Sequence, residues 1–246
     1  MPILEAKGVT RYFGGLAAVS NVDFRVEQGE ALGLIGPNGA GKTTLFNLIS
    51  AALPPRSGSI TFKEREIVGL RPHEICRMGL ARTFQTVKVF SNMSASQNVL
   101  LGACFGRQHR LASTEAAMEA TALLEFVGLA HAAETPARDL TLASQKRLEV
   151  ARALATRPDV LLLDEMMEGL NPTEVTRAMS LIKQIQKRGV TVIMIEHVMR
   201  AIMSVCDRIL VLHHGAKIAE GTPQEISASP KVIEVYFGEQ TDAENP

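Results

Sequence analysis

The feature that constrains this chain most is a glycine-rich loop at residues 36–43. Its sequence, Gly-Pro-Asn-Gly-Ala-Gly-Lys-Thr, matches the pattern G-x-x-x-x-G-K-[ST]. The loop follows a β-prone apolar run at 31–35 and precedes an apolar helical pattern at 45–48. Glycines let successive backbone N–H groups turn toward phosphate oxygens, and the N-terminus of the next helix adds positive charge. In this context the pattern predicts a phosphate-binding loop rather than an ordinary turn.

We expect this loop to bind ATP with Mg²⁺. Lys42 would place its ammonium on the β and γ phosphates, and Thr43 would offer its hydroxyl to the metal. The predicted nucleotide-binding residues of the loop are Gly36, Pro37, Asn38, Gly39, Ala40, Gly41, Lys42, Thr43 and Thr44. A GTPase would carry D-x-x-G and N-K-x-D, but Met167 occupies the third position after Asp164 and no Asn-Lys-x-Asp occurs. GTPase chemistry is therefore disfavoured.

Two adjacent carboxylates, Asp164 and Glu165, end another apolar run at 160–163. Burying two acids beside a strand is costly without cations, and a Mg²⁺-nucleotide would supply them. We expect Asp164 to face the metal and Glu165 to polarise the attacking water. The alternative is that both are surface acids at a strand end.

The rest of the chain predicts an α/β domain with a largely parallel sheet. Buried-strand runs recur at 160–163, 190–195 and 209–212, with helical stretches between them. From about residue 94 to 129 the apolar positions recur at helical spacing, which predicts a helical insertion. Asn171 and Pro172 are typical of a helix start. With 246 residues, 46% of them hydrophobic, one large domain is expected.

The charge balance, the cysteine spacing and the lack of a long apolar run argue against nucleic-acid-binding, zinc-binding and membrane-spanning proteins. Formal charge is zero, from 26 basic and 26 acidic residues, so no global field would recruit nucleic acid, and none is expected as a partner. The three cysteines show no C-x-x-C spacing and are interpreted as reduced core thiols. No apolar run approaches the roughly 20 residues that span a bilayer, and the N-terminus lacks a signal peptide. A cytoplasmic chain is expected.

Around these motifs the sequence resembles the ATPase subunits of ABC transporters over essentially its whole length. The resemblance implies an α/β P-loop NTPase ABC ATPase fold with an N-terminal antiparallel β subdomain and a helical insertion. It implies a single ABC ATPase domain over 1–246. Within that domain, the nucleotide-binding core would comprise 1–85 and 155–238, the helical subdomain 86–154 would carry the signature region, and 239–246 would be a frayed tail.

Further site residues follow from the resemblance. Gln85, in Arg-Thr-Phe-Gln, looks like the Q-loop glutamine that contacts Mg²⁺ and the water, and His197 looks like the switch histidine on the γ-phosphate. Phe13 matches the aromatic residue that stacks on adenine, with Tyr12 as the fallback. Residues 168–172 correspond to the D-loop of the dimer interface. The predicted catalytic residues are Glu165, His197 and Gln85, and the predicted metal residues are Thr43, Gln85 and Asp164.

The signature loop departs from the family pattern L-S-G-G-Q. In register with that pattern, residues 141–145 are Thr-Leu-Ala-Ser-Gln, which puts Leu142 at the serine and Ser144 at a glycine. Losing one hydroxyl contact to a charged oxygen costs about 1.5 to 3 kcal/mol. The site that this chain completes in a partner is therefore predicted to be weakened, with Ser144 as a partial substitute.

A finer resemblance, to the branched-chain amino-acid importer class, is carried by residues 13–19, 82–85, 169–172, 195–197 and 219–223. It implies an ATP-hydrolysing motor subunit, peripheral on the inner face of the cell membrane, for branched-chain or other amino acids or related small organic solutes. The implied partners are a second ABC ATPase subunit, identical or different, two membrane permease subunits and, indirectly, a solute-binding protein. The alternatives are a regulatory nucleotide-binding half of an asymmetric pair and the ATPase of another membrane complex.

The membrane subunits would be contacted by the region around residues 85–98. Val89, Phe90 and Met93 are candidate apolar contacts there, with burial in the subdomain core as the alternative.

Overall fold

The computed structural model describes residues 1–106 and 113–242. The chain forms two compact units, one comprising Met1–Arg71 with Thr191–Pro246 and the other comprising Pro72–Val190. The predicted division into a core and a helical subdomain has different boundaries and stays a prediction.

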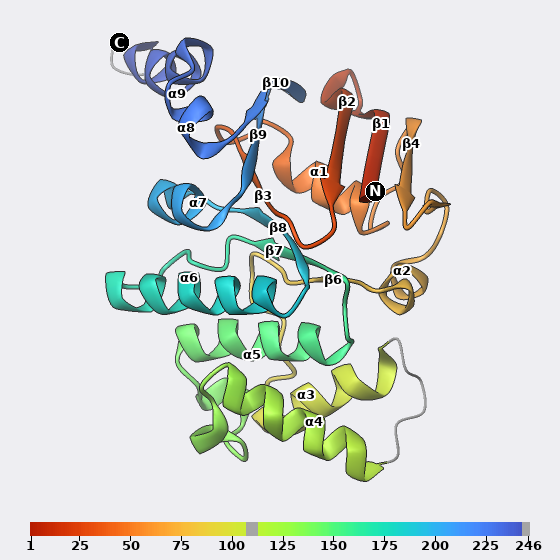
Figure 1. Cartoon of the computed structure of the whole chain (residues 1–246), viewed down its shortest axis with the longest axis vertical. Helices are drawn as coiled ribbons and strands as arrows, with labels where there is room; N and C mark the ends of the chain where they lie inside the picture. The colour runs from red at the N-terminus through yellow and green to blue at the C-terminus, as the bar shows by residue number, and fades with distance from the viewer. Residues whose placement is uncertain (107–112, 243–246) are drawn as a thin grey trace. The chain divides into compact units, whose positions relative to one another are not determined.

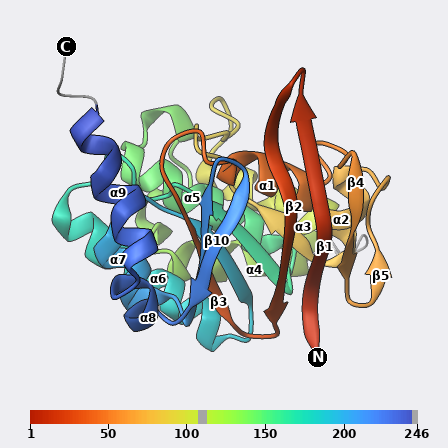
Figure 2. The ribbon, with the colours of Figure 1, turned by 90° about the horizontal axis from the view of Figure 1, so that it is seen from above.

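The first unit contains a four-stranded antiparallel sheet, in which β1 and β2 form a long ribbon (Figure 2). Its strands, in the order β2-β1-β4-β5, are β1 (Pro2–Phe13), β2 (Leu16–Glu27), β4 (Ser57–Phe62) and β5 (Arg65–Glu66). Val22, Phe24 and Val26 of β2 are buried and alternate with charged or polar residues. This period of two buries one face of the sheet and exposes the other. The predicted N-terminal antiparallel β subdomain is confirmed.

The same unit contains parallel strands that carry the phosphate-binding loop. Strand β3 (Ala31–Ile35) lies between β8 (Thr191–Ile195) and β9 (Arg208–His213) and pairs in parallel with both, while β10 (Ala216–Gly221) is antiparallel to β9. Every residue of β3 and β8 is buried, as expected for parallel strands covered on both faces. The helices of this unit are α1 (Lys42–Ile49), α7 (Met199–Val205), α8 (Pro223–Ser227) and α9 (Pro230–Asp242).

The predicted frayed tail at 239–246 overlaps the end of helix α9 and stays a prediction. The helix continues to Asp242, so residues 239–242 extend it beyond Gly238. Glu239 and Gln240 are good helix formers, which gives a physical reason for the extension. The remainder of the predicted tail, 243–246, lies outside the described residues.

The second unit is mainly helical and also holds two parallel strands, β6 (Leu80–Arg82) and β7 (Val160–Asp164). Its helices are α2 (Pro72–Met78), α3 (Ala95–Phe105), α4 (Ser113–Phe126), α5 (Leu142–Ala155) and α6 (Pro172–Lys187), with 3-10 turns at Ala130–Ala132 and Ala137–Asp139. Helices α3, α4 and α5 pack against one another (Figure 1). Ser94 and Asn171 begin α3 and α6 with capping boxes. The predicted helical insertion and helix start at Asn171 are confirmed.

Within the described ranges, no helix has the length and apolar character required to cross a membrane. The cysteines differ from our expectation that all three lie in the core. Cys206 is buried, Cys76 is half-buried and Cys104 is exposed. Cys104 falls on a turn of α3 beside exposed Phe105, and so the helical period carries it out of the core.

Candidate functional site

The predicted phosphate-binding loop connects β3 to α1, as the pattern requires. Gly36 has φ 151° and Gly41 has φ 100°, conformations that side-chain-bearing residues rarely adopt. A Cβ on Gly36 would lie 2.2 Å from the carbonyl oxygen of Leu212, and one on Gly41 would lie 2.2 Å from that of Ala18. The backbone path therefore depends on glycine at both positions.

Lys42 begins α1 with its side chain folded back over the loop. The residue is 6% exposed, and Nζ donates hydrogen bonds to the carbonyl oxygens of Gly36 at 2.7 Å and Pro37 at 2.9 Å. No side-chain oxygen caps α1, and its first turn carries no acid. This helix start is electropositive and suited to an anion.

Asp164 and Glu165 are buried at the end of β7, with 2% and 6% of their surface exposed. Burial excludes the alternative that they are surface acids. Arg82 Nη2 donates to Asp164 Oδ2 at 2.8 Å, and the backbone N–H of Asp164 donates to Thr83 Oγ1 at 3.2 Å. Arg82 ends strand β6 and Thr83 directly follows it, and both lie beside Asp164 because β6 pairs in parallel with β7. The first acid is therefore held at both its backbone and its side chain.

Glu165 is held by Gln85, the predicted Q-loop glutamine. Gln85 Nε2 donates to Glu165 Oε2 at 2.8 Å. Glu165 has φ 48°, a left-handed conformation that costs on the order of 1 kcal/mol outside glycine. Buried Lys146 contacts the same turn, because its Nζ donates to the carbonyl oxygens of Glu165 at 2.9 Å and Glu168 at 2.8 Å. The structure thus brings three predicted residues, Gln85, Asp164 and Glu165, into one cluster.

Glu149 of α5 anchors the chain on both sides of Gln85. Its carboxylate accepts hydrogen bonds from the backbone N–H of Phe84 at 3.5 Å and of Lys88 at 3.2 Å. Arg152 lies 3.6 Å from the same carboxylate. Burial raises the pKa of the Glu149 carboxyl, and the two backbone N–H groups and Arg152 oppose that rise. The helix that follows the signature loop is thereby tied to the Q-loop.

The signature loop carries a hydroxyl at Thr141, one residue before Leu142, which occupies the predicted signature-serine position. Thr141 is the N-cap of α5, and its Oγ1 accepts from the N–H of Ser144 at 3.3 Å. Leu142 is the first helical residue and is 47% exposed. The Ser144 hydroxyl accepts from Thr141 and from Arg147, both at 3.1 Å. Placing Leu142 as the counterpart of the signature serine therefore missed the exposed N-cap hydroxyl of Thr141.

His197 and Phe13 belong to the same unit as the phosphate-binding loop. His197 follows β8 and is exposed, and Phe13 is 47% exposed at the end of β1, with the Arg11 guanidinium 5.3 Å from its ring centroid. Both side chains are accessible, and their roles stay predictions. Sequence reasoning missed Tyr236 of α9, where burial raises the pKa of the hydroxyl and the backbone N–H of Gly36 opposes that rise.

The candidate membrane-subunit contacts are only partly accessible. Phe90 is 51% exposed, with the Arg152 guanidinium 5.3 Å from its ring centroid, whereas Val89 and Met93 are half-buried. The alternative that these residues are buried in the subdomain core is therefore wrong for Phe90.

The predicted metal residues fit Mg²⁺ by chemistry. A threonine hydroxyl, a glutamine amide oxygen and an aspartate carboxylate are the hard oxygen donors that Mg²⁺ prefers. In the part of the chain that the structure describes, no group of three or more histidine, cysteine or acidic side chains could hold a metal ion by itself. Mg²⁺ needs no such group, because it is commonly held by one or two carboxylates together with substrate phosphates.

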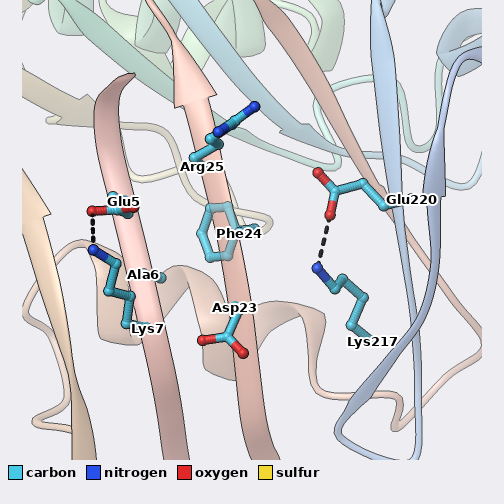
Figure 3. A pocket seen from close by; sticks show the side chains of 8 residues that line it. All are labelled: Glu5, Ala6, Lys7, Asp23, Phe24, Arg25, Lys217 and Glu220. Carbon is cyan, nitrogen blue, oxygen red and sulfur yellow. Dashed lines mark hydrogen bonds and ion pairs between the residues drawn. The ribbon is translucent and has the colours of Figure 1, made fainter. Parts of the chain in front are cut away.

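A shallow hollow of about 450 Å³ lies elsewhere on the first unit, against β1, β2 and β10 (Figure 3). Its charged side chains largely pair with one another, as Lys7 does with Glu5 and Lys217 with Glu220, each at 2.8 Å. Strands β2 and β10 are edge strands, and charged side chains discourage edges from pairing with other chains. The charged side chains of this hollow are therefore explained by protection of the two edge strands from pairing with other chains.

Comparison with known proteins agrees with this geometry. The ABC transporter family model matches residues 19–168, and the branched-chain amino acid ATP-binding cassette transporter model matches residues 216–242. The chain is 42% identical to the high-affinity branched-chain amino acid transport ATP-binding protein BraF of Pseudomonas aeruginosa, covering 97% of this chain and 98% of that protein.

Two further similarities bear on function. The chain is 36% identical to the lipopolysaccharide export system ATP-binding protein LptB of Acidithiobacillus ferridurans, again over 97% of this chain and 98% of that protein. Among solved structures, the ADP conformation of an ATP-binding cassette of an ABC transporter matches with a TM-score of 0.88 and 30% identity, over 97% of this chain and 99% of that chain. The predicted fold and the resemblance to the branched-chain importer class are confirmed.

Proposed function

The chain belongs to the ABC transporter family of ATP-binding subunits, and we propose that it is the ATP-hydrolysing motor of an importer for branched-chain or related amino acids. The observation that carries the chemistry is the pair of buried carboxylates, Asp164 and Glu165, with the 2.8 Å bond from Gln85 Nε2 to Glu165 Oε2. The substrate class is proposed from the 42% identity to BraF over nearly the whole chain.

In this proposal each predicted site residue has one role in ATP hydrolysis. Backbone N–H groups of the loop and the Lys42 ammonium bind the β and γ phosphates, and Phe13 stacks on the adenine. Glu165 orients and polarises the attacking water, Gln85 positions the Glu165 carboxylate, and His197 contacts the γ-phosphate. Thr43, Gln85 and Asp164 would hold Mg²⁺, which supplies positive charge to the phosphate oxygens.

The proposed assembly is a pair of ATPase subunits bound to two permease subunits at the inner face of the membrane, served by a solute-binding protein. The N-cap hydroxyl of Thr141, at the exposed start of α5, would contact the γ-phosphate held by the second subunit. A hydroxyl in this place favours an active half-site over the purely regulatory alternative.

A second candidate function is the motor of another envelope complex. The 36% identity to LptB over 97% of the chain favours it. The match of residues 216–242 to the branched-chain transporter model favours the importer.

Reconstitution in proteoliposomes tests the choice between the amino-acid importer and the motor of another envelope complex. The chain is assembled in proteoliposomes with candidate permease subunits and a candidate second ATPase from the same organism, and ATP-driven uptake of leucine, isoleucine and valine is measured with a candidate solute-binding protein present. ATP-dependent uptake of one of these amino acids, lost in a complex carrying Glu165→Gln, is the expected result. Hydrolysis that responds to no amino acid would refute the importer and leave the second candidate.

A further inference from the structure

Arg82 forms an ion pair with Asp164, the first carboxylate of the cluster. Its Nη2 lies 2.8 Å from Asp164 Oδ2, and the two side chains are 9% and 2% exposed. Arg82 ends β6, opposite Leu162 of β7, and its guanidinium lies 5.3 Å from the Phe84 ring centroid. Backbone register and ring packing therefore both hold the guanidinium beside the carboxylate.

A buried ion pair of this kind has a clear physical consequence. Removing a carboxylate from water is unfavourable, and a bonded guanidinium offsets much of that cost. Arg82 therefore supplies positive charge to Asp164. A metal ion that approaches the same carboxylate meets a positive charge already in place, and like charges repel.

We propose that Arg82 is a positioning residue that acts as a stand-in cation for Asp164 and weakens the hold of the site on the nucleotide-bound metal. The inference rests on the proposed function, because it takes Asp164 as a metal residue. Arg82 would keep the Asp164 carboxylate in place between turnovers. It would also favour departure of the metal with ADP, since the carboxylate returns to a partner 2.8 Å away.

An ordinary structural ion pair predicts a different pattern. If Arg82 served folding alone, its loss would lower stability equally with and without metal and would not strengthen metal binding. If Arg82 instead only oriented Asp164 toward the metal, its loss would weaken metal binding. The sign of the change in metal affinity separates the proposal from both.

The test measures Mn²⁺ binding to the ADP-bound full chain by electron paramagnetic resonance. Arg82→Gln is expected to bind Mn²⁺ about tenfold more tightly than the natural chain, the scale for removing one positive charge a few ångströms from the ion in a partly screened site. The matched control is Arg157→Gln, which removes a guanidinium that is likewise 2.8 Å from a carboxylate, that of Glu119. The control should leave Mn²⁺ affinity unchanged. Unchanged or weaker Mn²⁺ binding by Arg82→Gln would overturn the proposal.

Thermal unfolding adds a readout that does not depend on turnover. In EDTA, Arg82→Gln should have a lower melting temperature than the natural chain. Saturating Mn²⁺ with ADP should reduce this difference in melting temperature. An equal difference in both conditions would overturn the proposal. If Arg82→Gln fails to fold, Arg82→Lys replaces it in both measurements. Lysine keeps the positive charge but has a different donor geometry from the guanidinium. The proposal therefore requires Arg82→Lys to bind Mn²⁺ with an affinity within about threefold of that of the natural chain.

Asp164→Asn separates failure of this inference from failure of the proposed site. If Asp164→Asn binds Mn²⁺ as tightly as the natural chain, the metal role of Asp164 is wrong and the inference fails with it. If Asp164→Asn weakens Mn²⁺ binding while Arg82→Gln leaves it unchanged, the proposed site stands and only the role of Arg82 is wrong.

Discussion

Removing the Glu149 carboxylate should loosen the Q-loop and destabilise the fold. Glu149→Ala would leave the Phe84 and Lys88 N–H groups without their acceptor and the Arg152 guanidinium without its partner. Breaking one side of a buried ion pair costs about 3 to 5 kcal/mol. Since Glu149 and Arg152 lie 3.6 Å apart and the arginine side chain is 17% exposed, we expect the lower end, about 3 kcal/mol. Glu149→Gln keeps an acceptor and removes a buried charge, so its cost should stay within about 1 kcal/mol.

The pH dependence has a defined sign. Burial raises the pKa of the Glu149 carboxyl above its ordinary value of 4.5, so the folded chain binds this proton more tightly than the unfolded chain does. This contribution to stability is therefore complete below 4.5 and is lost as the pH rises through the folded-state pKa. Relative to Glu149→Gln, the natural chain should gain stability as the pH falls toward 4.5.

The assay is urea unfolding at several pH values, combined with hydrogen exchange at the Lys88 amide. Glu149→Ala should speed exchange there, because Lys88 loses its acceptor. Glu119→Ala is the control, since Glu119 pairs with the more exposed Arg157 and its loss should cost no more than about 1 kcal/mol. The reasoning is refuted if Glu149→Ala costs less than 1 kcal/mol, or if the natural chain loses stability relative to Glu149→Gln as the pH falls.

Four further substitutions test other parts of the site. Gly41→Ala should abolish nucleotide binding, because its Cβ would lie 2.2 Å from the Ala18 carbonyl oxygen; fluorescence titration of a labelled ADP that finds normal affinity would contradict the loop geometry. Tyr236→Phe removes the hydroxyl that the Gly36 N–H influences and should weaken binding of the same ADP about two- to tenfold, the range for one hydrogen bond, whereas unchanged affinity would make that hydroxyl irrelevant to the loop. Thr141→Val should lower ATP turnover of the assembled complex about tenfold or more, while Leu142→Ser changes it little; a larger effect of Leu142→Ser would assign the signature-serine position to Leu142.

The parts of the site that were predictable from the sequence are those fixed locally. The residues from 36 to 43 lie between a strand and a helix that their own periodicity marks, so the phosphate-binding loop needed no tertiary information. Asp164 and Glu165 follow an apolar run that is fully buried as β7. The helix start at Asn171 was predictable because a side-chain cap is a contact within four residues.

The supporting contacts were missed because they join distant residues. The Arg82 bond to Asp164 spans 82 positions and depends on the register of β6 against β7. Lys146 reaches its two carbonyl oxygens only after α5 takes up its rotation beside the turn at Glu165. One miss was avoidable, since threonine is a preferred N-cap residue and Thr141 directly precedes the helical pattern. Weighing the cap would have located the exposed hydroxyl of the signature loop.

The central claim is that this chain hydrolyses ATP with Glu165 as the residue that activates water. The most direct measurement is the ATP turnover of the assembled complex with the natural chain and with Glu165→Gln, alongside nucleotide affinity. We predict that Glu165→Gln retains nucleotide binding and loses turnover by at least about a hundredfold, the scale for losing a general base. Turnover that is unchanged in Glu165→Gln would contradict the account.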